Sequence, residues 1–122
     1  MTYLAVFDGA PNHYSVSRED LLTGLAASWP EIQAKIESGR DDTHDIVWSV
    51  RGDAGAIDIY HHRDGTCLYM DGALEDAAPF AVWYRTLVPS RVELLFCDDS
   101  YSFSVQITCE TTVADLVNAV QR

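Results

Sequence analysis

The sequence predicts an α+β fold, with an antiparallel sheet of about five to six strands and helices packed mainly on one face. Short segments that alternate between apolar and polar residues indicate strands with one buried side. Turn-forming residues separate neighbouring segments of this kind, and other segments space their apolar residues as helices do. The expected order of elements is β-α-β-β-β-α-β-β-α, within a single domain of residues 1–122.

The N-terminal part predicts a short strand and then a helix. The strand covers Tyr3–Phe7, and Ser17 followed by Asp20 has the three-residue spacing of a helix start. The apolar residues of that helix recur at helical spacing: Leu21, Leu22, Leu25 and Trp29.

Pro30 predicts an interruption of this helix. Proline suits the first turn of a helix better than its interior, so we expect a break before Pro30 and a second helical piece after it. This piece would carry Ile32 and Ile36 and end at Gly39. The polar run Arg40–Asp45 is expected to be a solvated loop.

The remainder predicts strands, a helix, a hairpin and a final helix. A helix is expected over Leu74–Leu87, with Pro79 near its start and Pro89 after its end. Thr112 and Asp115 mark the start of the last helix. The strands follow from five alternating apolar sets: Ile46-Trp48-Val50, Ile57-Ile59-His61, Leu68-Met70, Val92-Leu94-Phe96 and Phe103-Val105-Ile107.

Turn positions predict how these strands pair. Asp64-Gly65 favours a tight hairpin turn of type I′, which pairs residues whose numbers sum to 129. The same reasoning centres the other hairpins on Asp53-Ala54 and Asp99-Ser100. The pairs expected to face each other are Trp48 with Ile59, Val50 with Ile57, Ile59 with Met70, His61 with Leu68, Tyr60 with Tyr69, His62 with Cys67, Phe96 with Phe103, Leu94 with Val105 and Val92 with Ile107.

This pairing places the adjacent His61 and His62 on opposite faces, so they are not expected to share a metal ion. Since no other cysteines and histidines have ligand spacing, we predict no metal site, and no motif indicates a cofactor or a catalytic residue. One enzyme hypothesis stays open: His62 lies beside Cys67, and such a pair can supply a nucleophile.

Charge points to a protein partner. Nineteen acidic and eight basic residues give a net charge of −11, which repels nucleic acid and anionic lipid and attracts basic proteins. No secretion signal is evident and the three cysteines cannot all pair, so we expect a cytoplasmic protein. Tyrosines flanked by acids favour a partner-binding surface built from Asp58, Tyr60, His62, Tyr69, Asp71, Asp98, Asp99 and Tyr101.

In size, charge and element order the whole chain resembles the small acidic immunity proteins of bacterial polymorphic and contact-dependent toxin systems. The segment FAVWYRTLVPSRVELLFCDDSYSFSVQI, Phe80–Ile107, carries the local resemblance. The resemblance implies a cytoplasmic protein, not an enzyme, that binds a cognate toxin domain and occludes its active site. From Ser17 onward the order is also similar to that of class I type III secretion chaperones, which implies a homodimer that holds an effector segment.

Overall fold

The fold is an antiparallel sheet covered by helices, described by a computed structural model over residues 1–36 and 44–121. These residues form four helices, α1 (Gly9–Asn12), α2 (Arg18–Ser28), α3 (Leu74–Arg85) and α4 (Val113–Val120). They also form seven strands: β1 (Thr2–Val6), β2 (Lys35–Ile36), β3 (His44–Gly52), β4 (Gly55–His62), β5 (Cys67–Asp71), β6 (Leu94–Asp98) and β7 (Ser104–Ile107). The α+β class is confirmed, while the strand count exceeds the expected five to six and the order gains α1 and β2.

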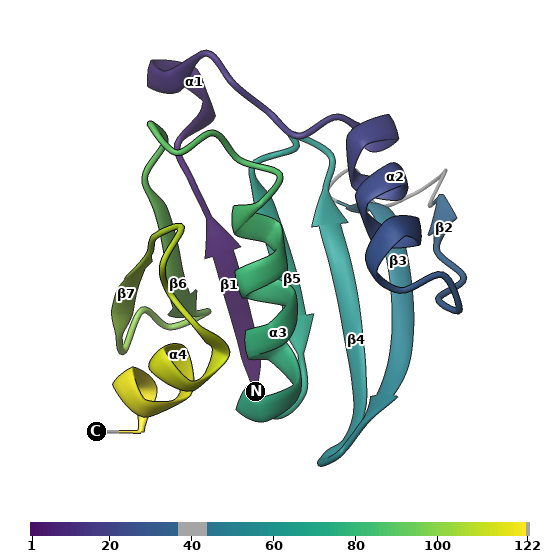
Figure 1. Ribbon diagram of the computed structural model, residues 1–122, viewed down its shortest axis with the longest axis vertical. Helices are drawn as coiled ribbons and strands as arrows, with labels where there is room; N and C mark the ends of the chain where they lie inside the picture. Colours follow the sequence, from purple (N-terminus) through teal and green to yellow (C-terminus); the bar gives the residue numbers. More distant parts are fainter. Residues whose placement is uncertain (37–43, 122) are drawn as a thin grey trace.

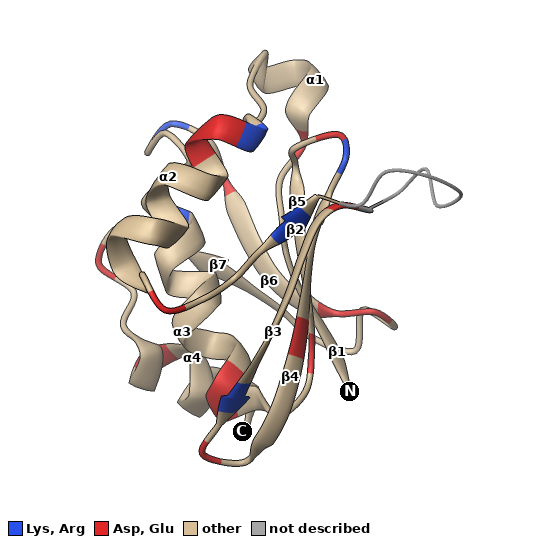
Figure 2. Cartoon of the chain, turned by 90° about the vertical axis from the view of Figure 1, so that its right-hand side faces the viewer, with Lys and Arg blue, Asp and Glu red and all other residues tan. Residues whose placement is uncertain are grey.

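The helices and the sheet form two layers. Helices α2, α3 and α4 lie against one face of the sheet, and α1 lies beyond the end of β1 (Figure 1). In the perpendicular view, no helix of the described residues covers the opposite face (Figure 2). None of the described helices is long and apolar enough to cross a lipid bilayer.

The first strand of the chain is central in the sheet. The strand order is β2-β3-β4-β5-β1-β6-β7, and β1 pairs antiparallel with both β5 and β6. Tyr3, Leu4 and Ala5 are consequently all buried, on both faces of the strand. Because β1 lies between β5 and β6, it joins strands β2 to β5 and the β6–β7 hairpin into one sheet.

The first helix begins as expected, but the segment after it does not form a helix. The Ser17 hydroxyl accepts a hydrogen bond from the Asp20 amide at 3.0 Å, and α2 ends at Ser28, before Pro30. The expectation of a second helical piece was wrong, because Ile36 belongs to β2 and pairs with Ile46. Ile32 follows a turn at Pro30 and Glu31, and Gly39 lies outside the described residues.

The expectation of a loop over Arg40–Asp45 was wrong for its last two residues. His44 and Asp45 begin β3, whereas residues 40–43 lie outside the described part of the chain. The Arg18 guanidinium donates two hydrogen bonds, of 3.1 and 2.6 Å, to the buried carboxylate of Asp45. This contact attaches the start of α2 to the sheet.

Two of the expected hairpin registers are confirmed. Trp48 pairs with Ile59, Val50 with Ile57, Ile59 with Met70, His61 with Leu68 and Tyr60 with Tyr69. The expected type I′ turn was wrong, because Gly65 has a positive φ (75°) and Asp64 does not. The pairing of β4 with β5 stops at His61 and Leu68, so the expected pairing of His62 with Cys67 is not formed.

The third hairpin register differs from the expected one by two residues. Leu94 pairs with Ile107, and Phe96 pairs with Val105 instead of Phe103. The longer connection is held by the Asp98 carboxylate, which accepts hydrogen bonds from the amide and the hydroxyl of Ser102. Because side chains alternate with a period of two, this shift leaves the paired residues of β6 and β7 on the faces that alternation assigned to them.

The core lies between the sheet and the helices. One aromatic cluster joins α2, β3 and α3, with ring centroids 4.6 Å apart for Trp29 and Phe80 and 6.4 Å apart for Trp48 and Trp83. Near the end of α3 the buried guanidinium of Arg85 donates to the carbonyls of Val88, Pro89, Val92 and Ile107. Arg85 therefore links α3 to the following loop and to β7.

Candidate functional site

The helix-free side of the sheet, called here the outer face, is the candidate site. Directly paired residues of neighbouring strands share a face, so the register arranges the outer side chains in rows across the sheet. The central row, called here the tyrosine row, consists of Val47, Tyr60, Tyr69, Leu4, Cys97 and Ser104. The next row, called here the acid row, consists of Ser49, Asp58, Asp71 and Thr2, with Asp99 beyond it.

The outer face has a packed apolar centre. Leu4, Cys67 and Cys97 are at most 7% exposed although they point away from the helices, because Val6 and Tyr69 pack against them. Tyr60 and Tyr69 are partly exposed and occupy adjacent positions of this row. The outer face therefore offers aromatic contact area on a rigid support, the arrangement that suits binding hot spots.

The acid row brings carboxylates together. Asp58 and Asp71 are directly opposite each other, where like charges destabilise a sheet. Ser49 donates a hydrogen bond to Asp58 at 2.5 Å, and Thr2 donates one to Asp71 at 3.3 Å. The N-terminal ammonium lies 3.8 Å from Asp71. These contacts offset part of the repulsion and leave an acidic border beside the tyrosine row.

The residues at the end of β6 separate into two groups. Asp98, expected at the partner-binding surface, is 2% exposed and lies opposite Tyr3, on the helix side of the sheet. Hydrogen bonds from Ser102 lower the pKa of the Asp98 carboxyl below its usual value, so Asp98 holds the turn in its ionised form. Asp99 is exposed at the end of the acid row, and Tyr101 is 70% exposed with a positive φ of 55°. Asp99 and Tyr101 therefore stay in the candidate surface, and Asp98 does not.

The adjacent histidines lie on opposite faces, as the pairing predicted. His61 is 1% exposed and its Nε2 lies 2.9 Å from the hydroxyl of Tyr84, a residue of α3. Burial lowers the pKa of His61 to about 4, so the ring is neutral near neutral pH. His62 is partly exposed on the outer face, where its Nδ1 accepts a hydrogen bond from the Asp64 amide at 3.0 Å.

The environment of Cys67 opposes thiolate formation. Its side chain is 5% exposed, and burial raises the pKa of the thiol to about 12. A positively charged neighbour lowers the pKa of a reactive cysteine, whereas the neighbours that act on the pKa of Cys67 are Tyr69 and Cys97. This geometry gives the enzyme hypothesis for His62 and Cys67 no support.

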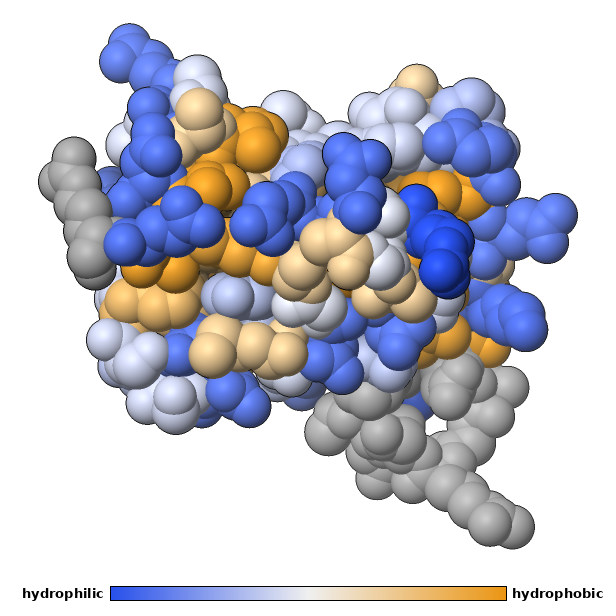
Figure 3. Space-filling model, turned by 90° about the horizontal axis from the view of Figure 1, so that it is seen from below, coloured by the Kyte–Doolittle hydropathy of each residue, from blue (hydrophilic) through white to orange (hydrophobic). Residues whose placement is uncertain are grey.

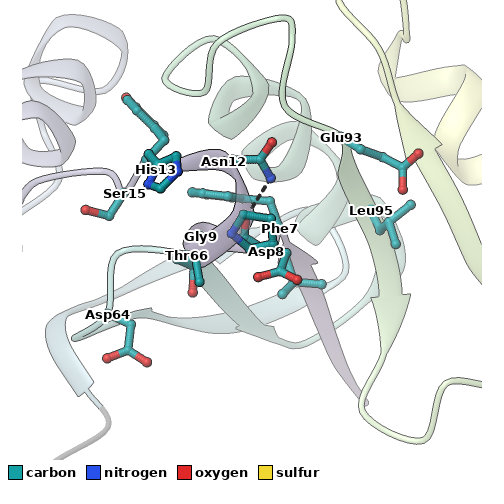
Figure 4. A pocket seen from close by; sticks show the side chains of 14 residues that line it. Phe7, Asp8, Gly9, Asn12, His13, Ser15, Asp64, Thr66, Glu93 and Leu95 are labelled. Carbon is teal, nitrogen blue, oxygen red and sulfur yellow. Dashed lines mark hydrogen bonds between the residues drawn. The ribbon is translucent and has the colours of Figure 1, made fainter.

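A pocket of about 1040 Å³ opens at the end of the sheet beside α1. Its three carboxylates come from separate segments: Asp64 and Glu93 lie at opposite sides of the close view, with Asp8 between them (Figure 4). The Asn12 amide donates to the Asp8 carbonyl at 2.6 Å, so this side chain stabilises its own turn. Within residues 1–36 and 44–121, no group of three or more histidine, cysteine or acidic side chains is placed to hold a metal ion.

Sequence reasoning missed a groove at the edge of β3. This groove has a volume of about 1020 Å³ and lies between β3, the segment after α2 and the start of α3. Pro30 was the sequence feature that could have indicated this groove. It follows the end of α2, and the chain after it pairs with β3 only at Lys35 and Ile36 among the described residues. Comparisons with models of protein families, with curated proteins and with solved structures give no match to this chain.

Proposed function

We propose that the chain is an immunity protein, which binds a cognate bacterial toxin domain in the cytoplasm and blocks its active site. The observation that carries the proposal is the outer face, where a row of partly exposed tyrosines is bordered by paired carboxylates. A central aromatic contact surrounded by charge is the usual anatomy of a tight protein interface.

The charge of the chain specifies the kind of partner. A net charge of −11 attracts a basic domain, and Asp58, Asp71 and Asp99 supply negative charge on the binding face itself. Complementary charge speeds encounter, and burial of tyrosines then slows dissociation. A toxin with a basic active-site cleft would present the matching surface.

The opposed pair of Asp58 and Asp71 also supports a binding role. Like charges in direct cross-strand positions destabilise a sheet. A stability cost at the surface is characteristic of residues retained for function. The complex would relieve it by placing a cation between the two carboxylates.

The proposal is tested by co-expression. Each candidate toxin domain encoded beside the gene for this chain would be expressed in a susceptible cell together with the wild-type protein or a variant. The wild-type protein is expected to restore growth, and Asp58→Asn with Asp71→Asn to restore it much less. The matched control, Glu19→Gln with Glu110→Gln, changes the net charge of −11 by the same amount at exposed positions outside the outer face.

Equal protection by both double variants would reject the outer face as the binding surface. Failure of the wild-type protein to protect against any neighbouring toxin domain would reject the immunity function. A stable dimer of the isolated protein at micromolar concentration, formed through the outer face, would favour the secretion-chaperone alternative instead.

A further inference from the structure

One edge of the sheet is largely unpaired. Among the described residues, β2 pairs with β3 through Lys35 with Val47 and Ile36 with Ile46. If the antiparallel pairing of β2 with β3 continued, residues 31–34 would lie opposite the rest of β3. Residues 31–34 are not part of a strand and do not pair with β3. Within residues 1–36 and 44–121, the edge of β3 from Trp48 to Gly52 is therefore open to another strand.

The turn between β3 and β4 determines which backbone groups this edge presents. Gly52 and Gly55 pair around a two-residue turn, so they form the first hydrogen-bonded pair of the hairpin. Alternation along the ladder then directs the amide and carbonyl of Ser49 and Arg51 away from β4. Unpaired groups in this arrangement form a template for strand addition.

The groove beside this edge has an apolar floor and an acidic rim. Trp29, Ile32 and Phe80 contribute apolar lining, and the end of the molecule near the β3–β4 turn shows hydrophobic surface between hydrophilic side chains (Figure 3). Four acidic residues line the groove, against two basic ones: Glu31, Asp53, Glu75 and Asp76 against Lys35 and Arg51. A basic segment with apolar side chains on one side would match both features.

The groove wall also contains a buried polar atom. Trp48 lines the groove and is 3% exposed, and its indole Nε1 finds no hydrogen-bond partner in the described part of the chain. An unsatisfied buried donor carries a free-energy cost that a carbonyl oxygen would remove. Because this nitrogen is itself buried, a carbonyl oxygen would reach it only if the groove wall moved.

We infer that an extended basic segment of the partner adds as an antiparallel strand to β3 between Trp48 and Gly52, with its apolar side chains in the groove. This inference rests on the proposed function and specifies how the partner binds. The groove is continuous with the outer face, since Val47, Ser49 and Tyr60 belong to both.

The first test uses a probe peptide and the wild-type protein. Acetyl-KLKLKLK-amide carries alternating lysines and leucines, and its binding is followed by fluorescence anisotropy of a labelled copy. Because the leucines face the groove, the lysine amides face β3, so N-methylation of the lysine at the third position of the peptide is expected to weaken binding about tenfold. N-methylation of a central leucine, whose amide faces solvent, is expected to change binding by less than about twofold. Equal effects of the two methyl groups, or no binding of the parent peptide, would overturn the inference.

The second test uses protein variants. Ser49→Pro removes an edge amide that β4 does not use, and proline is tolerated at such positions. Ser49→Ala removes the same hydroxyl but keeps the amide, so Ser49→Pro is expected to weaken the peptide about tenfold relative to Ser49→Ala. Equal affinities of two folded variants would overturn the inference, as would a dimer of the protein that forms through β3 and excludes the peptide. Neither test uses the toxin domain, so their failure leaves the co-expression result and the proposed function unaffected.

Discussion

The burial of His61 predicts a specific loss of stability in mild acid. His61 has an ordinary pKa of 6.5 when unfolded and a pKa of about 4 in the folded protein, because burial disfavours the charged ring. Between these values the unfolded chain binds more protons, so the free energy of unfolding decreases as the pH falls. The contribution of His61 is complete above about pH 6.5 and is lost progressively toward pH 4.

The size of this effect follows from the two pKa values. At about 1.36 kcal/mol for each pH unit between them, the full loss is roughly 3 kcal/mol. Asp45 and His62 act on the pKa of His61 in opposite directions, and both act less strongly than burial. The carboxyls of Asp45 and Asp98 have lowered pKa values, so their contributions are lost only below pH 3.8.

The assay compares urea unfolding of the wild-type protein and His61→Gln at several pH values from about 7.5 to about 4. The variant is expected to be less stable at neutral pH, by about 1–2 kcal/mol, because the contact with Tyr84 is altered. Its stability should fall less steeply with acid, so that the two curves converge or cross near the acid end. A constant difference between the curves across this range would refute the burial of a neutral His61.

Three further predictions concern other parts of the fold. Arg85→Met should lower the free energy of unfolding by roughly 3 kcal/mol, measured by denaturant titration, because three buried carbonyls and one partly buried carbonyl lose their donor. A loss below about 1 kcal/mol would contradict the role of Arg85. Gly52→Ala should cost about 1–2 kcal/mol, because a Cβ there would lie 2.2 Å from the Asp76 carboxylate that accepts from the Asp53 and Ala54 amides. Combining it with Asp76→Ala should cost less than the sum of the two, whereas additive costs would show that the two residues act independently. A thiol reagent should label the exposed Cys109 well before Cys67 and Cys97, followed by mass spectrometry, and fast labelling of Cys67 would revive the enzyme hypothesis.

Alternation and turn chemistry predicted the parts of the fold that depend on local pattern. Trp48, Ile59 and Met70 have their expected partners because a period of two and a glycine-containing turn determine both face and register. The β6–β7 register was two residues off because Asp98 accepts hydrogen bonds from Ser102 and lengthens the connection. Period-two patterns cannot detect an even shift, since every side chain keeps its face.

Contacts distant in the sequence were beyond local reasoning. The position of β1 between β5 and β6 depends on packing from both sides, and nothing within Thr2–Val6 specifies its neighbours. The same applies to Arg18 and Asp45, which are far apart in the chain and pair at the start of β3. Hairpin register predicted that four candidate residues share one face: Asp58, Tyr60, Tyr69 and Asp71. The groove beside β3 could not be predicted in this way, because it depends on the path of the chain after Pro30.

Hydroxyl-radical footprinting of the complex with the toxin domain tests the proposed binding face most directly. Oxidation of Tyr69 and Tyr101 should fall several-fold on binding, while Tyr14, which packs on the helix side against Phe7, should be oxidised at an unchanged rate. Protection of Tyr14 or of residues in α2 and α4, with Tyr69 and Tyr101 unaffected, would place the partner on the helix side and contradict the proposal.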